Sequence, residues 1–448
     1  MNNSDSQALL YRLNDRPQGT VLWLSAIQWF IFMLANFVTV PIVLGQTLGL
    51  GGEEIALFTS RTLFLCGLIG GLQVLFGHRL PIIEGPAGMW WGVFLVLITM
   101  NAQLGGTTET LLAELQMGLI VSSLVFILIA LFRLLHRLRA LFTPIITGTF
   151  LILLAMQVSK SLVEGILGIG YEGSEHVLPK IVLLSLLLIS ITVGLMMKAK
   201  GIIQSMAILI GLGTGWLLFA VLGMVRFPEG QTPWVALPEI FPFGAPQWNT
   251  GVVITCVITS LILLSNLIAS IQVFAVSAGE KTTDSMLNKG SFITGVGTLL
   301  SGLFGTIAAV PLTAAASLVA LTRIASGLPF LIASIGFVVL GLLPKVGQWL
   351  SSIPQPVGYA ILFTVFGQLL GFGLRDLKQL KLDQRDLFVV GFSLLAGIGL
   401  LFVPGHAWEG LPSIVGFLLG NGLIVGVTIA VLLEHVIFRV KKEEADPQ

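Results

Sequence analysis

Residues 81–90 hold the side chain of this sequence that is best suited to binding or proton chemistry. They read PIIEGPAGMW, so the carboxylate of Glu84 lies in an apolar stretch just before a turn rich in glycine and proline. A continuous helix is implausible here, and we expect an extended chain before Pro86 and a helix from Pro86 or just after it. An ionisable residue within a membrane is costly and usually functional. Glu84 is therefore predicted to bind substrate or carry a proton; the alternative is an ion pair with Arg79 near the cytoplasmic face.

A second interruption lies at residues 310–317, which read VPLTAAAS. Pro311 breaks the apolar run, and Thr313 is the predicted N-cap of the alanine-rich half-helix that follows. Irregular backbone at membrane depth is stable only where protein or a polar cavity satisfies its N–H and C=O groups. Half-helix N-termini also offer free N–H groups and a positive dipole end to a polar substrate. The two interruptions together predict a substrate site, against the alternative of two packing kinks.

Uncharged polar side chains form a third group of candidates. Asn36 lies in the first long apolar stretch, and a later one holds Ser260, Ser265, Asn266 and Ser270. An amide within a membrane span needs a partner, which can be a neighbouring helix or a substrate. Both assignments stay open for the two asparagines.

Metal and enzyme chemistry find little support in the sequence. The histidines fall in loops or near the ends of apolar stretches and form no HExxH motif; they are His78, His136, His176, His406 and His435. Cys66 and Cys256 lie in apolar stretches and are interpreted as packing residues. We expect no metal, no cofactor and no enzymatic activity.

The elements that must position these residues are membrane helices. With 55% apolar and 10% charged residues over 448 positions, the chain has too little polar surface for a soluble globule of its size. A helix needs about 20 apolar residues to cross a bilayer, and such stretches predict an all-α polytopic membrane protein with fourteen segments. Their ranges are 21–44, 55–77, 81–100, 114–132, 141–163, 179–197, 201–224, 250–275, 289–305, 307–322, 327–344, 354–374, 386–404 and 412–438. The net charge of +1 and the lack of a long basic run argue against a nucleic-acid partner.

The distribution of basic residues predicts the side of the membrane on which each end lies. If the N-terminal tail, residues 1–20, is cytoplasmic, the inside segments hold 18 of the 23 Lys and Arg residues, as the positive-inside rule requires. An even number of segments then places the basic C-terminal tail, residues 439–448, inside as well. We expect a multi-pass protein of the inner or plasma membrane with both termini in the cytoplasm.

A weak internal repeat suggests two inverted halves. A proline-bearing entry opens the fifth segment at Pro144 and the twelfth at Pro354. Segments seven apart face opposite ways, as in the inverted repeats of transporters. Prolines favour helix starts in general, so this pair alone leaves both interpretations open.

The order and spacing of several short motifs resemble the nucleobase-ascorbate transporter family, which includes bacterial uracil and xanthine permeases and purine permease-like proteins. The motifs are residues 28–29 (QW) through 40–41 (VP), 80–81 (LP) with Gly85, 301–305 (SGLFG), 320–323 (ALTR) and 352–356 (SIPQP). The resemblance implies two inverted repeats of seven segments. It implies a core domain of residues 21–132 and 250–344 and a gate domain of residues 141–224 and 354–438. Short strands in segments three and ten would each precede a half-helix, with substrate bound between them.

The resemblance also implies substrate-binding glutamates, and here the sequence departs from the family. The family's glutamate of segment eight falls at Ile262, and its Glu-Asn pair of segment ten falls at Ala314 and Ala315. A carboxylate would select the N–H edge of a base, and a buried carboxyl is the usual proton carrier. The resemblance therefore does not identify which base is transported, and it does not imply that transport is coupled to protons.

The other binding positions that the resemblance implies lie in segments one, three, eight and ten. They are Asn36, Gly88 in place of a stacking aromatic, Asn266, Leu312 and Thr313. As a hypothesis, Glu84 supplies the missing carboxylate and the proton site, and Trp90, beside Met89, supplies the missing aromatic face.

These observations favour a secondary active transporter that takes up a purine, xanthine or uracil-like base by proton symport, with an elevator-like movement of the core. The expected partners are the base, a coupling ion that we take to be H⁺, and the lipid bilayer; a homodimer is left open. The alternatives are a facilitator or anion carrier of the same fold, a non-translocating membrane sensor, and a membrane-embedded enzyme. A sensor would usually carry a soluble output domain, and the predicted C-terminal tail is short.

Overall fold

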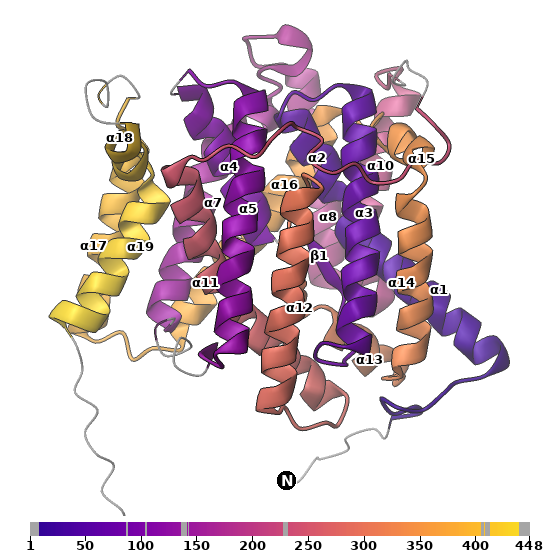
Figure 1. The fold of residues 1–448 in the computed structure, drawn as a ribbon. Helices are drawn as coiled ribbons and strands as arrows, with labels where there is room; N and C mark the ends of the chain where they lie inside the picture. The colour runs from indigo at the N-terminus through magenta and orange to yellow at the C-terminus, as the bar shows by residue number, and fades with distance from the viewer. Residues whose placement is uncertain are drawn as a thin grey trace, which may run out of the picture.

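The chain folds into a bundle of helices with one small sheet in its interior (Figure 1). The computed structural model describes residues 9–86, 88–103, 105–135, 141, 143–226, 232–404, 407 and 413–438. Within them, seven helices are long and apolar enough to cross a membrane, or eight if the pair α14 (Gly327–Gly341) and α15 (Pro344–Leu350), bent by 83°, counts as one span. The chain is therefore a multi-pass membrane protein, and the total of fourteen segments stays a prediction.

The first half of the described chain alternates long helices with shorter pieces. Its elements are α1 (Gly19–Phe37), α2 (Thr39–Thr47), α3 (Gly52–Leu75), β1 (Glu84–Pro86), α4 (Gly88–Gln103), α5 (Thr108–Leu131), α7 (Pro144–Leu167), η1 (Tyr171–Gly173), α8 (Pro179–Lys198), α9 (Ile202–Ser205) and α10 (Ala207–Val221). The second half follows a similar order. Its elements, besides α14 and α15, are α11 (Thr250–Ser277), α12 (Asp284–Leu303), β2 (Ala309–Pro311), α13 (Ala315–Thr322), α16 (Gln355–Lys378), α17 (Gln384–Leu400), α18 (Ser413–Gly420), α19 (Gly422–Leu432) and the π-helical turn η3 (Leu433–Ile437).

Each of the fourteen predicted segments overlaps a helix, or a strand followed by a helix. Helices α5 and α12 begin earlier than predicted because Thr107 and Thr283 cap polar first turns, accepting hydrogen bonds from the N–H groups of Thr110 and Met286. The last predicted segment, expected as one helix, is broken in the structure. There Asn421 separates α18 from α19 and caps the second helix through the N–H groups of the two residues after Gly422.

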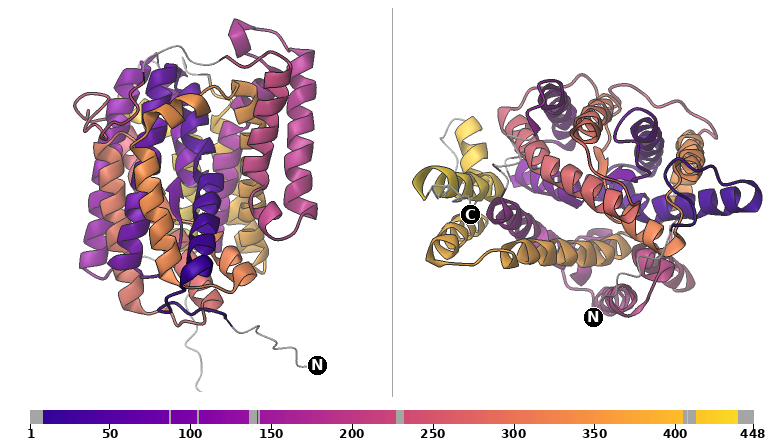
Figure 2. Two further views of the ribbon diagram at one scale, coloured as in Figure 1. Left: turned by 90° about the vertical axis from the view of Figure 1, so that its right-hand side faces the viewer. Right: turned by 90° about the horizontal axis from the view of Figure 1, so that it is seen from below.

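Two groups of helices pack around different centres (Figure 2). In one group, α5 packs on α12 and α11, and α3 packs on α14, with the strands enclosed between them. In the other, α16 packs on α7 and α8, and α17 packs on α19. The strands therefore lie within the first group, which continues to the second through α4 against α7 and α2 against α16.

Strands β1 and β2 pair antiparallel across the centre of the first group. Glu84 lies opposite Pro311, and Pro86 lies opposite Ala309. All six strand residues are buried, so the hydrogen bonds of the pair replace those that water cannot supply there.

The predicted N-cap of the second half-helix is wrong. Helix α13 begins at Ala315, its N-cap position is Ala314, and no side chain caps it. The backbone closes a tight turn instead, because the N–H of Ala315 donates to the carbonyl of Leu312 and that of Ala316 to the carbonyl of Thr313. Thr313 lies one residue too early to act as the cap, and its side chain is exposed.

Candidate substrate site

The carbonyl group of Pro311 joins strand β2 to helix α11 through hydrogen bonds. Its oxygen accepts a hydrogen bond from Asn266 Nδ2 at 3.0 Å and another from Ser270 Oγ at 3.1 Å. Asn266 and Ser270 lie four apart on one face of α11. Pro311 has no N–H to donate, and the next residue, Leu312, donates its N–H to Ile83 at 3.0 Å instead. The amide of Asn266 therefore holds strand β2 in place, and its role in binding a substrate stays a prediction.

The two half-helices start directly after the paired strands. Helix α4 begins at Gly88 and α13 at Ala315, so both N-termini, with their positive dipole ends, leave the same small sheet. Among the described residues, the N–H groups of Thr313 and Ala314 have no acceptor. The Thr313 side chain and that of Ser317, one turn into α13, are exposed. This end of α13 can donate hydrogen bonds to a polar ligand.

Gly85 allows strand β1 to lie against helix α1. A Cβ atom at this position would lie 2.7 Å from Cζ of Phe37 and closer still to two other atoms of the ring. Phe37 is wholly buried and packs edge-on against Phe337 of α14, with ring centroids 5.7 Å apart. The ring therefore has little room to move, and glycine is required for the close approach.

Glu84 is paired with His78, for which the sequence predicts no role. Its Oε1 lies 3.3 Å from Nε2 of His78, and both side chains are wholly buried. Its other carboxyl oxygen, Oε2, has no hydrogen-bond partner among the described residues. Arg79, the expected alternative partner, is exposed, with its backbone in the left-handed region at φ 61°. No sequence motif marks His78, and only its distance of six residues from Glu84 could have suggested the pair.

The remaining predicted residues have varied surroundings. Asn36 donates its amide to the carbonyl of Phe32 in its own helix at 2.8 Å, and its side chain is half-buried. Gly88 faces α16, where a Cβ atom would lie 3.7 Å from Leu369. Trp90 is wholly buried, packs edge-on against Phe94, and leaves Nε1 without an acceptor in the described part of the chain.

The other predicted positions differ mainly in exposure. Ile262 and Ala315 are buried, whereas Met89, Leu312 and Ala314 are half-buried. The structure thus brings Asn266, Leu312 and the backbone of Glu84 together at the strand pair. The hydrogen bond of Asn36 and the ring contact of Trp90 lie within their own helices, α1 and α4.

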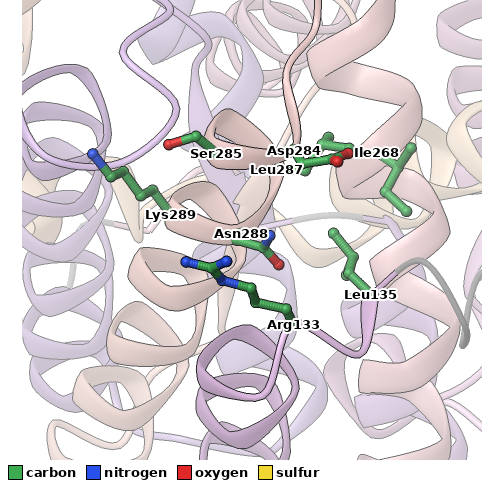
Figure 3. A pocket seen from close by; sticks show the side chains of 8 residues that line it. All are labelled: Arg133, Leu135, Ile268, Asp284, Ser285, Leu287, Asn288 and Lys289. Carbon is green, nitrogen blue, oxygen red and sulfur yellow. The ribbon is translucent and has the colours of Figure 1, made fainter.

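A cavity of about 400 Å³ is lined by none of the residues of strands β1 and β2 (Figure 3). It lies where the end of α5 meets the start of α12 and is lined by residues of mixed charge, namely Arg133, Leu135, Ile268, Asp284, Ser285, Leu287, Asn288 and Lys289. None of the predicted site residues lines it. The strand pair, which combines broken helices with a buried carboxyl, remains the better candidate site.

In the described part of the chain, no group of three or more His, Cys, Asp or Glu side chains is placed to hold a metal ion. The polar groups at the strand pair are hydroxyls, amides, one carboxyl and backbone N–H groups. Such a set suits an uncharged or weakly charged polar ligand.

The sequence is similar to known permeases over almost its whole length. The family model described as the permease family matches residues 21–406. The Bacillus subtilis (strain 168) protein YwdJ, whose name proposes it as a purine permease, is 35% identical over 424 residues, covering 92% of this chain and 95% of that protein. The xanthine permease of the same organism is 27% identical over 434 residues, covering 94% and 95%. The uric acid transporter UacT of Escherichia coli (strain K12) is 26% identical over 463 residues, covering 100% and 93%.

Solved structures of more distant proteins share the fold. The transmembrane domain of the cyanobacterial bicarbonate transporter BicA has a TM-score of 0.60 at 16% identity, covering 93% of this chain and 98% of that chain. The murine Solute Carrier 26 family member A9 anion transporter, in the inward-facing state, has a TM-score of 0.62 at 12% identity, covering 95% and 69%. At these identities the likeness concerns the fold alone.

Proposed function

Since this chain belongs to the nucleobase-ascorbate transporter family of permeases, we propose that it takes up a purine or a similar heterocyclic base across the inner membrane. The match over residues 21–406 confirms the resemblance noted in the motifs. The relatives are permeases named for purines, xanthine and uric acid, which supports nucleobase transport by this chain and argues against an enzyme.

The observation that carries the proposal is the pair of half-helices that leave one buried, two-stranded sheet. The N–H groups of Thr313 and Ala314, which have no acceptor among the described residues, suit the carbonyl oxygens and ring nitrogens on the edge of a purine. The exposed hydroxyl of Thr313 can donate to such an edge or accept from it. The base would lie beside Leu312 and Gly88, with Met89 and Asn36 as further lining and Asn266 holding the strand beneath.

The proposed architecture has fourteen segments in two inverted repeats of seven, with β1 in the third segment and β2 in the tenth. The core domain would comprise residues 21–132 and 250–344, and the gate domain residues 141–224 and 354–438. Both termini would be cytoplasmic, as the charge distribution favours. A homodimer is compatible with this arrangement.

An elevator-like movement of the core against the gate is supported by the small residues where the two groups meet. A Cβ atom at Gly92 would lie 2.8 Å from Leu154 of α7, and one at Gly358 would lie 2.6 Å from Val43 of α2. Glycines let helices approach closely and leave a smooth contact surface. The polar side chains of the described residues that bond across the contact include Gln46, which donates to the carbonyl of Ile353 at 2.6 Å, and Asn421, which donates to Thr255 Oγ1 at 3.5 Å.

Proton symport is the proposed coupling, with Glu84 as the carrier. Its carboxyl group is wholly buried within the first group of helices, and strand β1 leads directly to the half-helix at Gly88. A carboxyl in such a place takes up and releases a proton only when a movement of the protein gives water access to it. Binding of the base at the strand pair and protonation of Glu84 would then act on the same element.

Uptake by purified protein in proteoliposomes tests the proposal. With an inward proton gradient, xanthine, uric acid, hypoxanthine and uracil are offered in turn, and bicarbonate serves as the anion control. Accumulation of a purine above its external concentration is the expected result. Equilibration without accumulation would indicate a facilitator, transport of bicarbonate alone an anion carrier, and binding without flux a sensor.

A further inference from the structure

The buried carboxyl of Glu84 belongs to a connected polar cluster between α3, α12 and β1. Gln73 of α3 donates through Nε2 to the carbonyl of Gly290 at 3.1 Å and to Thr294 Oγ1 at 3.0 Å, both in α12. Its Oε1 accepts the N–H of His78 at 3.4 Å. Arg79, the next residue, has a positive φ of 61°, and the His78 side chain is wholly buried. Gln73 therefore fixes the backbone at His78, and the imidazole lies close to Gly290, where an added Cβ atom would be 3.4 Å from Cδ2 of the ring.

The hydrogen bonds of His78 determine which of its ring nitrogens carries the proton. The N–H of Leu80 donates to Nδ1 at 3.1 Å, so Nδ1 is an acceptor and has no hydrogen of its own. The ring proton of the neutral imidazole is then on Nε2, which lies 3.3 Å from Glu84 Oε1 and donates to it. An imidazolium would require a hydrogen on Nδ1, directly opposed to the N–H of Leu80. The ring is held in one neutral tautomer.

The surroundings of Glu84 leave one oxygen for proton exchange. Oε1 is occupied by the Nε2–H of His78, while Oε2 is buried without a partner among the described residues. Among the described residues, the buried thiol of Cys66 on α3 also interacts electrostatically with the carboxyl. From α1 and β2, the other elements against β1, no charged side chain of the described chain pairs with it.

We propose that His78 is a positioning residue that stays neutral throughout transport, donates to Glu84 Oε1 in both states of the carboxyl, and confines proton binding to Oε2. In the loading step, Oε2 of the carboxylate takes a proton from hydronium, leaving water and a neutral acid. In the release step, water takes the same proton back. The imidazole neither gains nor loses a proton in either step. This inference rests on the proposed role of Glu84 as the proton carrier.

Two variants of His78 distinguish a positioning residue from a proton relay. A positioning role predicts different pH profiles for the two variants, whereas a relay through His78 predicts the same loss in both. His78→Gln keeps an N–H donor in the place of Nε2 but cannot carry a proton, whereas His78→Met has similar length and no donor. Purine uptake is measured between pH 5 and 8 in proteoliposomes, together with thermal unfolding of each variant. Glu84→Gln is measured alongside.

We expect His78→Gln to transport more slowly but to keep the midpoint of the wild-type pH profile. His78→Met should move the midpoint to higher pH by about one unit, because the carboxylate loses a donor that stabilises it more than the neutral acid. Loss of pH dependence in His78→Gln would overturn the proposal, since the imidazole would then carry the proton. So would an unshifted midpoint in a folded His78→Met.

Comparison of the variants distinguishes a failure of the proposed role of His78 from a failure of Glu84 as the proton carrier. If His78→Met does not fold, His78→Gln still decides between a positioning residue and a proton relay. If Glu84→Gln keeps the wild-type pH profile, the carrier is another group and the proposed coupling fails, together with the role of His78. If Glu84→Gln loses pH dependence and His78→Gln loses it too, only the inference about His78 fails.

Discussion

Substitution of Gly85 by alanine probes the contact between strand β1 and helix α1. The added methyl group would lie 2.7 Å from Cζ of Phe37, whereas carbon atoms in contact are about 3.5–4.0 Å apart. The ring cannot retreat easily, because Phe337 lies edge-on behind it at 5.7 Å between centroids. Either the ring or the strand must shift, and overpacking of this kind costs about 1–3 kcal/mol.

Strand β1 leads to the half-helix that begins at Gly88. We therefore expect the free energy of overpacking to appear largely as weaker binding of the base, because a shifted strand displaces the start of that half-helix. A loss of about 1–3 kcal/mol corresponds to a dissociation constant for the base that is raised about 5- to 150-fold. Binding of labelled purine to purified protein measures this constant directly. Thermal unfolding, followed in parallel, measures how much of the penalty appears as lost stability.

A second substitution makes the reasoning testable. Phe37→Leu removes the ring atoms that the methyl group would meet, so the double variant Gly85→Ala/Phe37→Leu should bind more tightly than Gly85→Ala alone. The matched control is Gly371→Ala in α16, where an added Cβ atom meets nothing within 4 Å and no change is expected. Wild-type affinity in Gly85→Ala, or no rescue in the double variant, would refute the proposed steric contact.

Three other substitutions test separate parts of the account. Asn266→Ala and Ser270→Ala each leave one donor on the carbonyl of Pro311 and should lower the free energy of unfolding by about 0.5–1.5 kcal/mol. In thermal unfolding, the double variant should lose more than the sum of the two single losses, because the buried acceptor is then unpaired. Additive losses would contradict this expectation. Thr313→Val should raise the dissociation constant of the base about 3- to 10-fold, the value of one hydrogen bond, with unchanged stability because the side chain is exposed; unchanged affinity would place the base elsewhere. Glu84→Gln should make uptake independent of pH, since an amide cannot exchange the proton, and a retained pH profile would remove Glu84 as the carrier.

The breaks in the helices could be predicted because their causes are local. Gly85, Pro86 and Gly88 disfavour a helix by backbone sterics alone, and strand β1 ends where that cluster lies. The long helices were predictable for a similar reason, since each needs an apolar stretch of membrane length. The break at Asn421 was missed because an asparagine within an apolar run does not by itself forbid a helix.

The partners of the site residues could not be predicted because they come from distant parts of the chain. The register that sets Glu84 opposite Pro311 joins the two halves of the sequence. The bond from Asn266 to that proline depends on how α11 packs on β2. His78 falls between two predicted segments, and its burial depends on contacts with Gln73 of α3 and Gly290 of α12. Thr313 fits the preference for an N-cap, but the backbone turn leaves it one position too early.

Simultaneous recording of base uptake and of lumen acidification in proteoliposomes tests the central claim most directly. The account predicts that a purine enters together with protons, that lumen acidification requires the purine, and that Glu84→Gln abolishes the proton signal while the protein remains folded. Entry of the purine without protons, or proton entry that persists in Glu84→Gln, would contradict it.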